Sequence, residues 1–451
     1  MKNVIVIGGG DVGAYLGRSF TERGDNVVLI EQNPVIARQI DEELNVQVKC
    51  ASGASAEVLH ECRVENCDFF LALTQNDHVN LIACSIAKRM GAKLTVARIH
   101  DNTYSDYSYL NYQLQFGVDL LVNPESLAAN EIAKSLRSSG RVAVENFGHG
   151  EIEVQQMGVS PHSSCIGKTL KEIKLGDGLR IAYMSQNGEV ILPSRETRIE
   201  PYAQVTLVGH PSKIFEARKM FKADTPLGHV LNVAICGANE ASVALIKQLS
   251  SGNFRIKLFE PDELVCEQLA DRFPNITVVN GKGTSLRLLE EESVGECDHF
   301  IAATKSDEEN IMSCLQARKL GARHLHLILN RVDYEGVVQD LRQDLHLHTI
   351  AAPRIVTAEE LMRFTSDESV IELASLPDQV ATFFEVRIEE NSAGHNKLIS
   401  EIALPQGCVI IALLHKFQVK VPAAHDRILA GDRLILIAHP SQRAAFEKAL
   451  L

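Results

Sequence analysis

The chain has no tryptophan, and aromatic residues make up only 5% of its 451 residues. It also has no apolar run near the roughly 18 residues needed to cross a bilayer, the longest being residues 409–414. The apolar run at residues 4–7 is followed directly by three glycines and is too short for a signal peptide. We therefore expect a cytoplasmic protein that does not itself span a membrane.

A basic surface and a metal motif are also missing. The net charge is -13, and lysine and arginine are interspersed with acidic residues without forming a basic stripe, so we expect no nucleic-acid partner. The ten cysteines include no C-x-x-C pair, and we expect most of them to be small buried residues. Two His-x-His pairs, at 324/326 and 346/348, arise on strands more often by chance than as metal ligands, so no metal is predicted.

What the sequence does contain is a long internal repeat. The segment CDFFLALTQNDHVNLIACSIAKRMGA, from Cys67, recurs as CDHFIAATKSDEENIMSCLQARKLGA from Cys297, an offset of 230 residues. Upstream, NVIVIGGGDVGAYLGRSF from Asn3 matches NVAICGANEASVALIKQL from Asn232 at an offset of 229. An offset this constant indicates duplication of a whole domain.

Each copy alternates strand and helix patterns, which predicts a parallel sheet covered on both faces. The first copy has expected strands at 3–7, 27–30, 46–48, 69–73 and 94–99, with helices from residues 11, 34, 56 and 77. Each copy is followed by a shorter segment, and these two segments also resemble each other. The prediction is an α/β chain of two Rossmann-like doubly wound domains, each followed by a small α+β lobe: residues 1–140, 141–225, 228–360 and 368–451.

A glycine motif, Gly8-x-Gly10-x-x-Gly13, lies between the first expected strand and helix. In this context the three glycines permit a tight turn, close approach of a pyrophosphate and close helix packing. Glu31 follows 18 residues after Gly13, at the end of the second strand, where its carboxylate can accept both ribose hydroxyls and repel a 2′-phosphate. The expected ligand is NAD(H) or ATP/ADP, and not NADP.

Further candidate residues follow the later strands, at the sheet edge where such ligands bind. Ser52 follows the third strand, Thr74 to Asp77 follow the fourth, and Arg98 ends the fifth. Two interpretations stay open: these residues contact the nucleotide, or they cap the next helix and end a strand in the ordinary way.

The second copy has an eroded version of the motif. Asn239 and Ser242 replace Gly10 and Gly13, and Ile328 replaces Arg98. Gly237 and Glu260 are kept, and Gly281 and Gly283 leave room for an adenine in the loop after the third strand. We expect the second site to be weak or empty.

These residues, together with ALTQNDHVNLIAC from Ala72 and ARI from Ala97, resemble the RCK (KTN) domains that regulate potassium transport. The order of lobes resembles the tandem regulatory subunits of Trk-type potassium uptake systems. The resemblance implies a homo-oligomer, dimer or tetrameric ring, peripheral on the inner face of the membrane, which gates a potassium-translocating subunit of the TrkH/TrkG type. By motif position it places these residues at the nucleotide: Gly8, Gly9, Gly10, Asp11 and Val12 at the phosphates, Glu31 at the ribose, Thr74 and Gln75 after the fourth strand, and Arg98 at the phosphates.

The chain departs from the family pattern at two turns. A Gly-Asp pair is kept at 431–432 but is replaced by Tyr202-Ala203 in the first copy. The family's Gly-Asp pair after the third strand is replaced by Ala51-Ser52.

Two other classes of protein also remain open. The first is a nicotinamide-dependent oxidoreductase, which needs a catalytic domain with a general acid or base. The short segments that follow each copy are too small to be such a domain. The second is a scaffold with vestigial nucleotide sites, which fits only the eroded second copy.

Overall fold

The computed structural model describes the chain except residues 106–108, 138–143, 148–151, 174, 176–177, 187–188, 192, 194, 222–229, 251–253, 332–333, 335, 337, 339, 341, 343–344, 367, 376–380, 406 and 416–417. The described residues form two six-stranded and two five-stranded sheets. The predicted fold class is confirmed. The predicted boundaries at 140–141 and 225–228 fall on or beside undescribed residues and remain a prediction.

The first six-stranded sheet is parallel, with the strand order β3-β2-β1-β4-β5-β6. The order reverses between β1 and β4, which creates a crevice at the carboxyl ends of these two strands. The strands are β1 (Asn3–Ile7), β2 (Asn26–Glu31), β3 (Gln47–Cys50), β4 (Phe69–Ala72), β5 (Leu94–Arg98) and β6 (Leu120–Val122). We call residues 1–122, which contain this sheet, the first N-lobe.

Helices cover both faces of this sheet because its strands are apolar on both sides. Val4 and Val6 of β1 pack in one core with Leu16 of α1, while Ile5 and Ile7 pack in a second core with Leu81 of α4. The helices are α1 (Asp11–Glu22), α2 (Pro34–Glu43), α3 (Ala56–Glu61), α4 (Asp77–Met90) and α5 (Tyr112–Phe116). This double coverage leaves the strand ends as the place for a ligand.

The second six-stranded sheet repeats the first, in the order β14-β13-β12-β15-β16-β17. Its strands are β12 (Leu231–Cys236), β13 (Phe254–Glu260), β14 (Thr277–Asn280), β15 (His299–Ala302), β16 (His324–Ile328) and β17 (Leu347–Ala351). Its helices include α9 (Glu240–Leu249), α10 (Glu263–Arg272), α11 (Leu286–Glu291) and α12 (Asp307–Leu320). We call residues 231–351 the second N-lobe.

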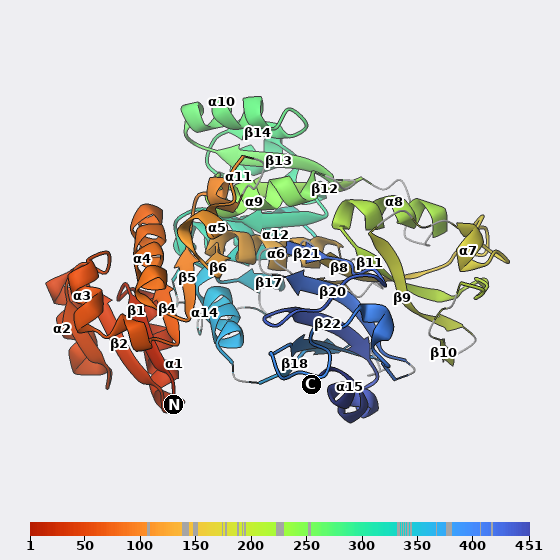
Figure 1. Ribbon diagram of the computed structural model, residues 1–451. Helices are drawn as coiled ribbons and strands as arrows, with labels where there is room; N and C mark the ends of the chain where they lie inside the picture. Colours follow the sequence, from red (N-terminus) through yellow and green to blue (C-terminus); the bar gives the residue numbers. More distant parts are fainter. Residues whose placement is uncertain are drawn as a thin grey trace. The chain divides into compact units, whose positions relative to one another are not determined.

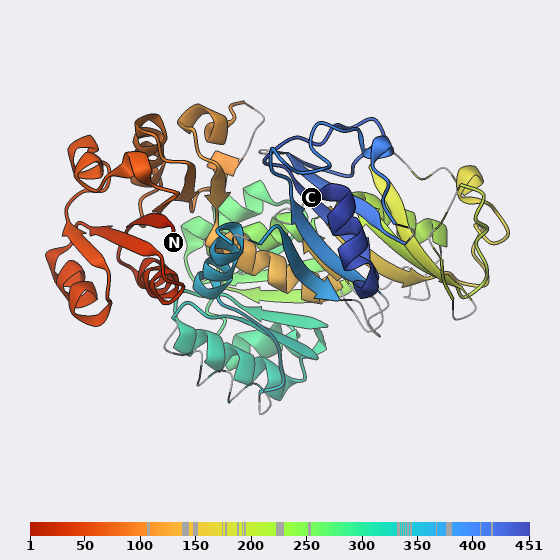
Figure 2. The ribbon, with the colours of Figure 1, turned by 60° about the horizontal axis from the view of Figure 1, so that its bottom comes forward.

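Helix α14 (Pro353–Phe364) follows the second N-lobe in sequence but packs on the first. Ala358, Leu361 and Phe364 enter the core that also contains Val12 and Leu16 of α1. Figures 1 and 2 both show α14 beside α1. The helix also continues past residue 360, where the sequence predicted the unit to end. The two halves of the chain are therefore connected by packing as well as by sequence.

The shorter segments form two antiparallel sheets, in the orders β10-β9-β11-β8-β7 and β18-β19-β22-β20-β21. Tyr183 and Val208 of the first share a core with Phe383 and Ile437 of the second. The elements are β7 (Val144–Phe147), β8 (Ile152–Gly158), α7 (Leu170–Ile173), β9 (Leu179–Gln186), β10 (Glu189–Ile191), β11 (Gln204–Gly209), α8 (Pro211–Phe221), β18 (Val370–Ser375), β19 (Thr382–Arg387), β20 (Val409–His415), β21 (Gln418–Lys420), β22 (Arg433–Ala438) and α15 (Arg443–Leu450). We call these two segments the C-lobes.

The turn that differs between the C-lobes keeps its backbone shape. Gly431 has a φ of 88°, and Tyr202, at the same place in the first C-lobe, has a φ of 63°. Asp432 is buried and accepts a hydrogen bond from the Leu429 amide (2.8 Å), a bond that Ala203 cannot make. A left-handed tyrosine costs about 1 kcal/mol or more, so the first C-lobe keeps this turn under strain.

Among the described residues, no helix has both the length and the apolar character required to cross a membrane.

Candidate nucleotide-binding site

The loop between β1 and α1 has the shape that its glycines predict. Gly8 has a φ of 98°, and its amide donates to the Ile30 carbonyl at 2.9 Å. A Cβ atom on Gly13 would lie 2.0 Å from the Gly8 carbonyl oxygen. The turn therefore requires glycine at position 8, and the close approach of α1 to the turn requires glycine at position 13.

The N-terminus of α1 is open. Gly10 occupies the N-cap position without a side-chain cap, and a Cβ atom there would meet no atom within 4 Å. Uncapped amides and the positive end of the helix dipole make such a terminus a binding place for anions. Val12 is buried, so only its backbone can face a ligand. Asp11 is exposed and forms an ion pair with Arg354 of α14.

Glu31 lies at the carboxyl end of β2, next to the glycine loop. Its Oε2 accepts a hydrogen bond from the Gly9 amide at 2.6 Å, and its Oε1 accepts one from the Asn33 amide at 2.7 Å. The structure thus places the acidic group where the motif requires a ribose-binding carboxylate. The same carboxylate holds the loop in shape.

The loop after β3 packs against the end of β1. A Cβ atom on Gly53 would lie 2.2 Å from the Ile7 side chain, and the Ser52 carbonyl accepts from the Ser55 amide at 3.3 Å. Ser52 therefore lies at the same strand edge as the glycine loop, as predicted.

The loop after β4 is held by Asn80, a residue that the sequence reasoning did not select. Asn80 is fully buried; its Oδ1 accepts from the Thr74 amide (3.0 Å) and hydroxyl (2.6 Å), and its amide group donates to the Thr74 and Arg98 carbonyls. The equivalent Asn310 makes the same set of bonds with Thr304 and Ile328. The exact repetition of this asparagine between the two copies was the signal that could have identified it.

The neighbouring polar residues of this loop have structural roles. Asn76 caps α4 by accepting from the Val79 amide at 3.1 Å, as the capping interpretation predicted. Asp77 instead accepts from the amides of His100 and Asp101 and so fixes the loop after β5. Gln75, Asn76 and Asp77 all line the adjoining cleft.

Arg98 ends β5, and its Nε is buried with no hydrogen-bond partner among the residues that the structure describes. Burial lowers the pKa of its guanidinium, while the charges of Glu125 and Asp77 act in the opposite direction. A buried, unpaired donor of this kind is costly and suits a site that an anion completes.

Two more arginines lie in this region besides Arg98. Arg354 reaches Asp11 at the start of α1, and Arg272 lines the adjoining cleft. Both come from the second half of the chain. The sequence could not reveal them because their proximity depends on how α14 and the second N-lobe pack.

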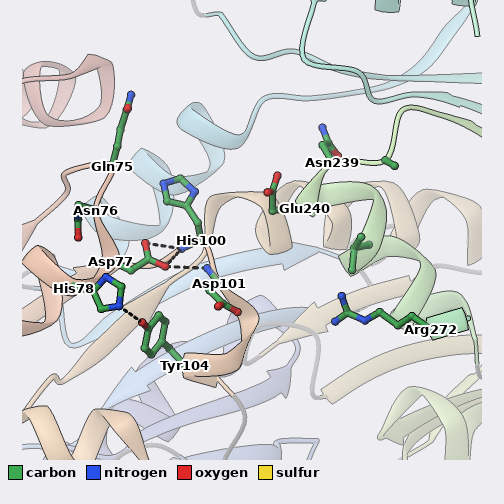
Figure 3. Close-up of a pocket in the computed structure, with 12 residues that line it drawn as sticks. Gln75, Asn76, Asp77, His78, His100, Asp101, Tyr104, Asn239, Glu240 and Arg272 are labelled. Atoms are coloured by element: carbon green, nitrogen blue, oxygen red, sulfur yellow. Dashed lines mark hydrogen bonds between the residues drawn. The ribbon is translucent and has the colours of Figure 1, made fainter. Parts of the chain in front are cut away.

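The adjoining cleft has a volume of about 560 Å³. Figure 3 shows Asp77, His100 and Asp101 on one side and Glu240 and Arg272 on the other. Its lining consists of Gln75, Asn76, Asp77, His78, His100, Asp101, Tyr104, Ala238, Asn239, Glu240, Val243 and Arg272. The cleft thus connects the edge of the first site with the loop that corresponds to it in the second N-lobe.

That corresponding loop in the second N-lobe is closed by its own side chains. Asn239 accepts from the Ser242 amide at 2.9 Å, and the Ser242 hydroxyl donates to the Gly237 carbonyl at 2.6 Å. Glu260 accepts from the Ala238 amide at 3.0 Å, as Glu31 does from Gly9. The helix terminus that is open in the first copy is therefore capped in the second.

The loop after β14 also has less free space than expected. A Cβ atom on Gly281 would lie 2.4 Å from Leu288, and one on Gly283 would lie 2.4 Å from the Cys236 sulfur. These two glycines are accounted for by close packing. They give no separate support for an adenine in the second N-lobe.

Gly13→Val is expected to destabilise the first N-lobe by about 3 kcal/mol or more, because its side chain would overlap the Gly8 carbonyl. Gly10→Ala is the matched control, since its Cβ atom enters open space. Thermal unfolding of the two variants measures the difference. Equal melting temperatures would contradict the close approach of α1 to the turn.

Comparison with known proteins identifies the family. The TrkA-N domain model matches residues 4–124 and 233–351, and the TrkA-C domain model matches residues 154–222 and 383–451. The Trk system potassium uptake protein TrkA homolog 1 of Methanosarcina mazei is 27% identical, covering 98% of this chain and 99% of that protein. The Trk system potassium uptake protein TrkA of Halomonas elongata is 25% identical, with coverages of 98% and 96%.

Solved structures agree on the fold. The GsuK channel bound to NAD is similar with a TM-score of 0.59 and 19% identity, covering 99% of this chain and 78% of that one. The GsuK RCK domain has a TM-score of 0.57 and 19% identity, with coverages of 99% and 94%. The relatives carry the names of potassium uptake proteins and not of dehydrogenases, which confirms the non-enzymatic prediction. With both domain types matched twice and in alternation, the chain belongs to the TrkA family of Trk potassium uptake proteins.

Proposed function

We propose that this protein is the nucleotide-sensing regulatory subunit of a Trk-type potassium uptake system. In this proposal the first N-lobe binds NAD(H) or ATP/ADP, and the bound nucleotide changes the activity of a potassium-translocating membrane subunit of the TrkH/TrkG type. The protein acts as a homo-oligomer, dimer or tetrameric ring, from the cytoplasmic side of the membrane.

The difference between the two helix N-termini carries this proposal. At α1 the cap position is a glycine with open space around it, whereas at α9 the Asn239 side chain occupies the cap. A phosphate needs backbone amides that no other acceptor occupies. The first copy is therefore built to receive an anion at the N-terminus of α1. In the second copy the Asn239 side chain already caps the N-terminus of α9.

The acidic side chain at β2 selects the kind of nucleotide. Glu31 lies beside the glycine loop, where a carboxylate can bind a ribose diol and repels a 2′-phosphate. We therefore propose that NADP is excluded. The GsuK structures described as bound to NAD and to ADP belong to proteins of the same fold, and they make these nucleotides the first ones to test.

A regulatory role requires that the nucleotide site affect more than its own lobe. Arg354 and the apolar residues of α14 bring the second half of the chain against α1, whose N-terminus forms the proposed phosphate site. A ligand that binds more tightly to one arrangement of these elements shifts the population toward it. This packing gives the nucleotide a physical route to the rest of the chain.

Arg98→Ala is expected to uncouple the nucleotide from transport, because it removes the cation whose Nε has no partner within the described protein. In cells lacking the native gene, the wild-type chain should restore growth at low external potassium, and the variant should restore it with a reduced response to nucleotide. Potassium flux into vesicles that contain the transporter and purified protein measures this response at defined NADH, ATP and ADP.

Ile328→Ala is the matched control in the second N-lobe, and it should leave the nucleotide response unchanged. Normal potassium uptake in the deletion strain, together with no binding between the purified protein and the transporter, would refute the regulatory proposal. Nucleotide binding would still be measurable on the isolated protein.

A further inference from the structure

Four histidines lie together on three neighbouring strands of the second N-lobe. His299 begins β15, His324 and His326 lie on β16, and His348 lies on β17. Their rings form a closed circuit in which consecutive centroids are 5.1, 5.0, 5.7 and 5.2 Å apart, from His299 through His324, His348 and His326 back to His299. We call these four residues the histidine cluster.

The inner half of the histidine cluster is buried. His299 is 3% exposed and His326 is 0% exposed, while His324 and His348 reach solvent. The Nδ1 of His299 lies 3.0 Å from the Nε2 of His326, a contact that needs one N–H donor and one lone pair. The Nδ1 of His326 is buried and has no hydrogen-bond partner within the described part of the chain. This nitrogen is least costly to bury when it carries no hydrogen. The hydrogen of a neutral His326 ring then lies on Nε2 and is donated to His299, so the contact is satisfied when both rings are neutral.

Adding a proton to this arrangement is unfavourable for two reasons. The charge would be buried, and it would be repelled by any other protonated imidazole of the cluster. Burial lowers the pKa of His299 to about 4 and the pKa of His326 well below its usual range, in both cases with a further decrease from the neighbouring histidines. Of the nearby charges, Asp298 favours protonation of His299 and His324, and Arg323 opposes that of His324.

The first N-lobe shows that the fold does not need histidines at these places. With the repeat offset of 230 residues, His299, His324 and His326 correspond to Phe69, Leu94 and Val96. The strand register is also the same, since Phe69 pairs with Leu94 as His299 pairs with His324. The duplicated lobes thus differ by three imidazoles on one face of the sheet.

We propose that the histidine cluster is an acid sensor. At mildly acidic pH its histidines take up protons when the sheet of the second N-lobe opens, and this uptake favours the loosened state of that sheet but not of the sheet of the first N-lobe. Among the described residues, no group of histidine, cysteine or acidic side chains is placed to hold a metal ion. The ligand that the cluster accepts is therefore the proton.

The direction of the effect follows from linkage. A histidine in the unfolded chain has a pKa of about 6.5, so between that value and the lowered pKa of the folded cluster the unfolded chain binds more protons. Stability is then fully present above about pH 6.5 and falls as the pH decreases toward 4.

Loosening of this sheet would also affect the loops at its opposite edge. At the carboxyl ends of β15 and β16, Asn310 donates to the Ile328 carbonyl at 3.0 Å, and the Asn330 amide donates to Asp307 at 2.8 Å. These bonds join the two strands to the loop that corresponds to the Thr74 loop of the first site. Protonation thus adds a second input, distinct from the nucleotide.

The test uses the full chain and the triple variant His299→Phe, His324→Leu and His326→Val, which restores the residues of the first N-lobe. Between about pH 7.5 and pH 5.5 the melting temperature of the wild type should fall by about 5 °C more than that of the variant. Hydrogen exchange, corrected for its intrinsic pH dependence, should show lost protection in β15 and β16 at the lower pH, with β4 and β5 unchanged.

Hydrogen exchange on the wild type decides the question even if the triple variant does not fold. Equal loss of protection in the two N-lobes, or an equal fall in melting temperature for both proteins, would overturn the proposal. Stoichiometric zinc in the purified protein, with a pH response that disappears on chelation, would also overturn it in favour of a metal site.

Discussion

Gly10→Glu is expected to lower the affinity of the protein for NADH and ATP by roughly 100-fold or more without unfolding it. The new carboxylate would occupy the open space at the N-terminus of α1 and carry the same charge as the phosphates that this terminus is proposed to bind. Since a Cβ atom at Gly10 meets no atom within 4 Å, the substitution adds no overlap to the fold.

Isothermal titration with NADH, NAD, ADP and ATP measures the affinity, and thermal unfolding confirms that the variant is folded. The matched control is Asn239→Glu, which places the same group on the corresponding position of the second N-lobe. It should leave the main binding event unchanged. Wild-type affinity in Gly10→Glu would mean that the phosphates lie elsewhere, and loss of affinity only in the control would assign binding to the second N-lobe.

Glu31→Gln is expected to weaken nucleotide binding by about tenfold or more. It removes the charge from the group proposed to accept the ribose hydroxyls, and a charge-assisted hydrogen bond contributes about 1.5 to 3 kcal/mol. It also replaces one of the acceptors that hold the Gly9 and Asn33 amides. The same change should reduce discrimination against NADPH, because the repulsion of its 2′-phosphate disappears.

Glu260→Gln is the control for this prediction, since Glu260 holds the Ala238 amide in the same way. Its effect on nucleotide affinity should be small, because the second site is capped by Asn239. If the two variants weaken binding equally, both N-lobes bind nucleotide. If neither does, the ribose lies away from Glu31 and the proposed pocket is misplaced.

The local features of the site could be predicted because they depend on neighbours in the sequence. A turn with positive φ at Gly8, an N-cap at Gly10 and a helix packed close at Gly13 are properties of one β-turn-α segment, which a spacing of glycines specifies. The alternation of strands and helices likewise predicted the parallel sheet. The repeat offset then predicted that the second N-lobe has the same topology.

The assignment of polar roles could not be completed in this way. Thr74, Asn76 and Asp77 are equally compatible with a ligand or with helix capping when only their order is known. The structure separates them: Asn76 caps α4, Asp77 holds the loop after β5, and Thr74 is bound to the buried Asn80. The contact of Asp77 joins segments that are far apart in the sequence. Those of Asn76 and Thr74 are local, but the order of residues alone does not show which group each side chain meets.

The sequence by itself determined the duplicated α/β fold, the intact glycine motif of the first copy and its erosion in the second, because each is encoded within a short stretch of chain. Only the tertiary structure decided which groups meet across long separations. It placed Arg354 beside Asp11, joined Asp77 to the loop after β5, and gathered four histidines from three strands. The physical reason is that side-chain proximity depends on helix packing and strand register, which join residues far apart in the sequence.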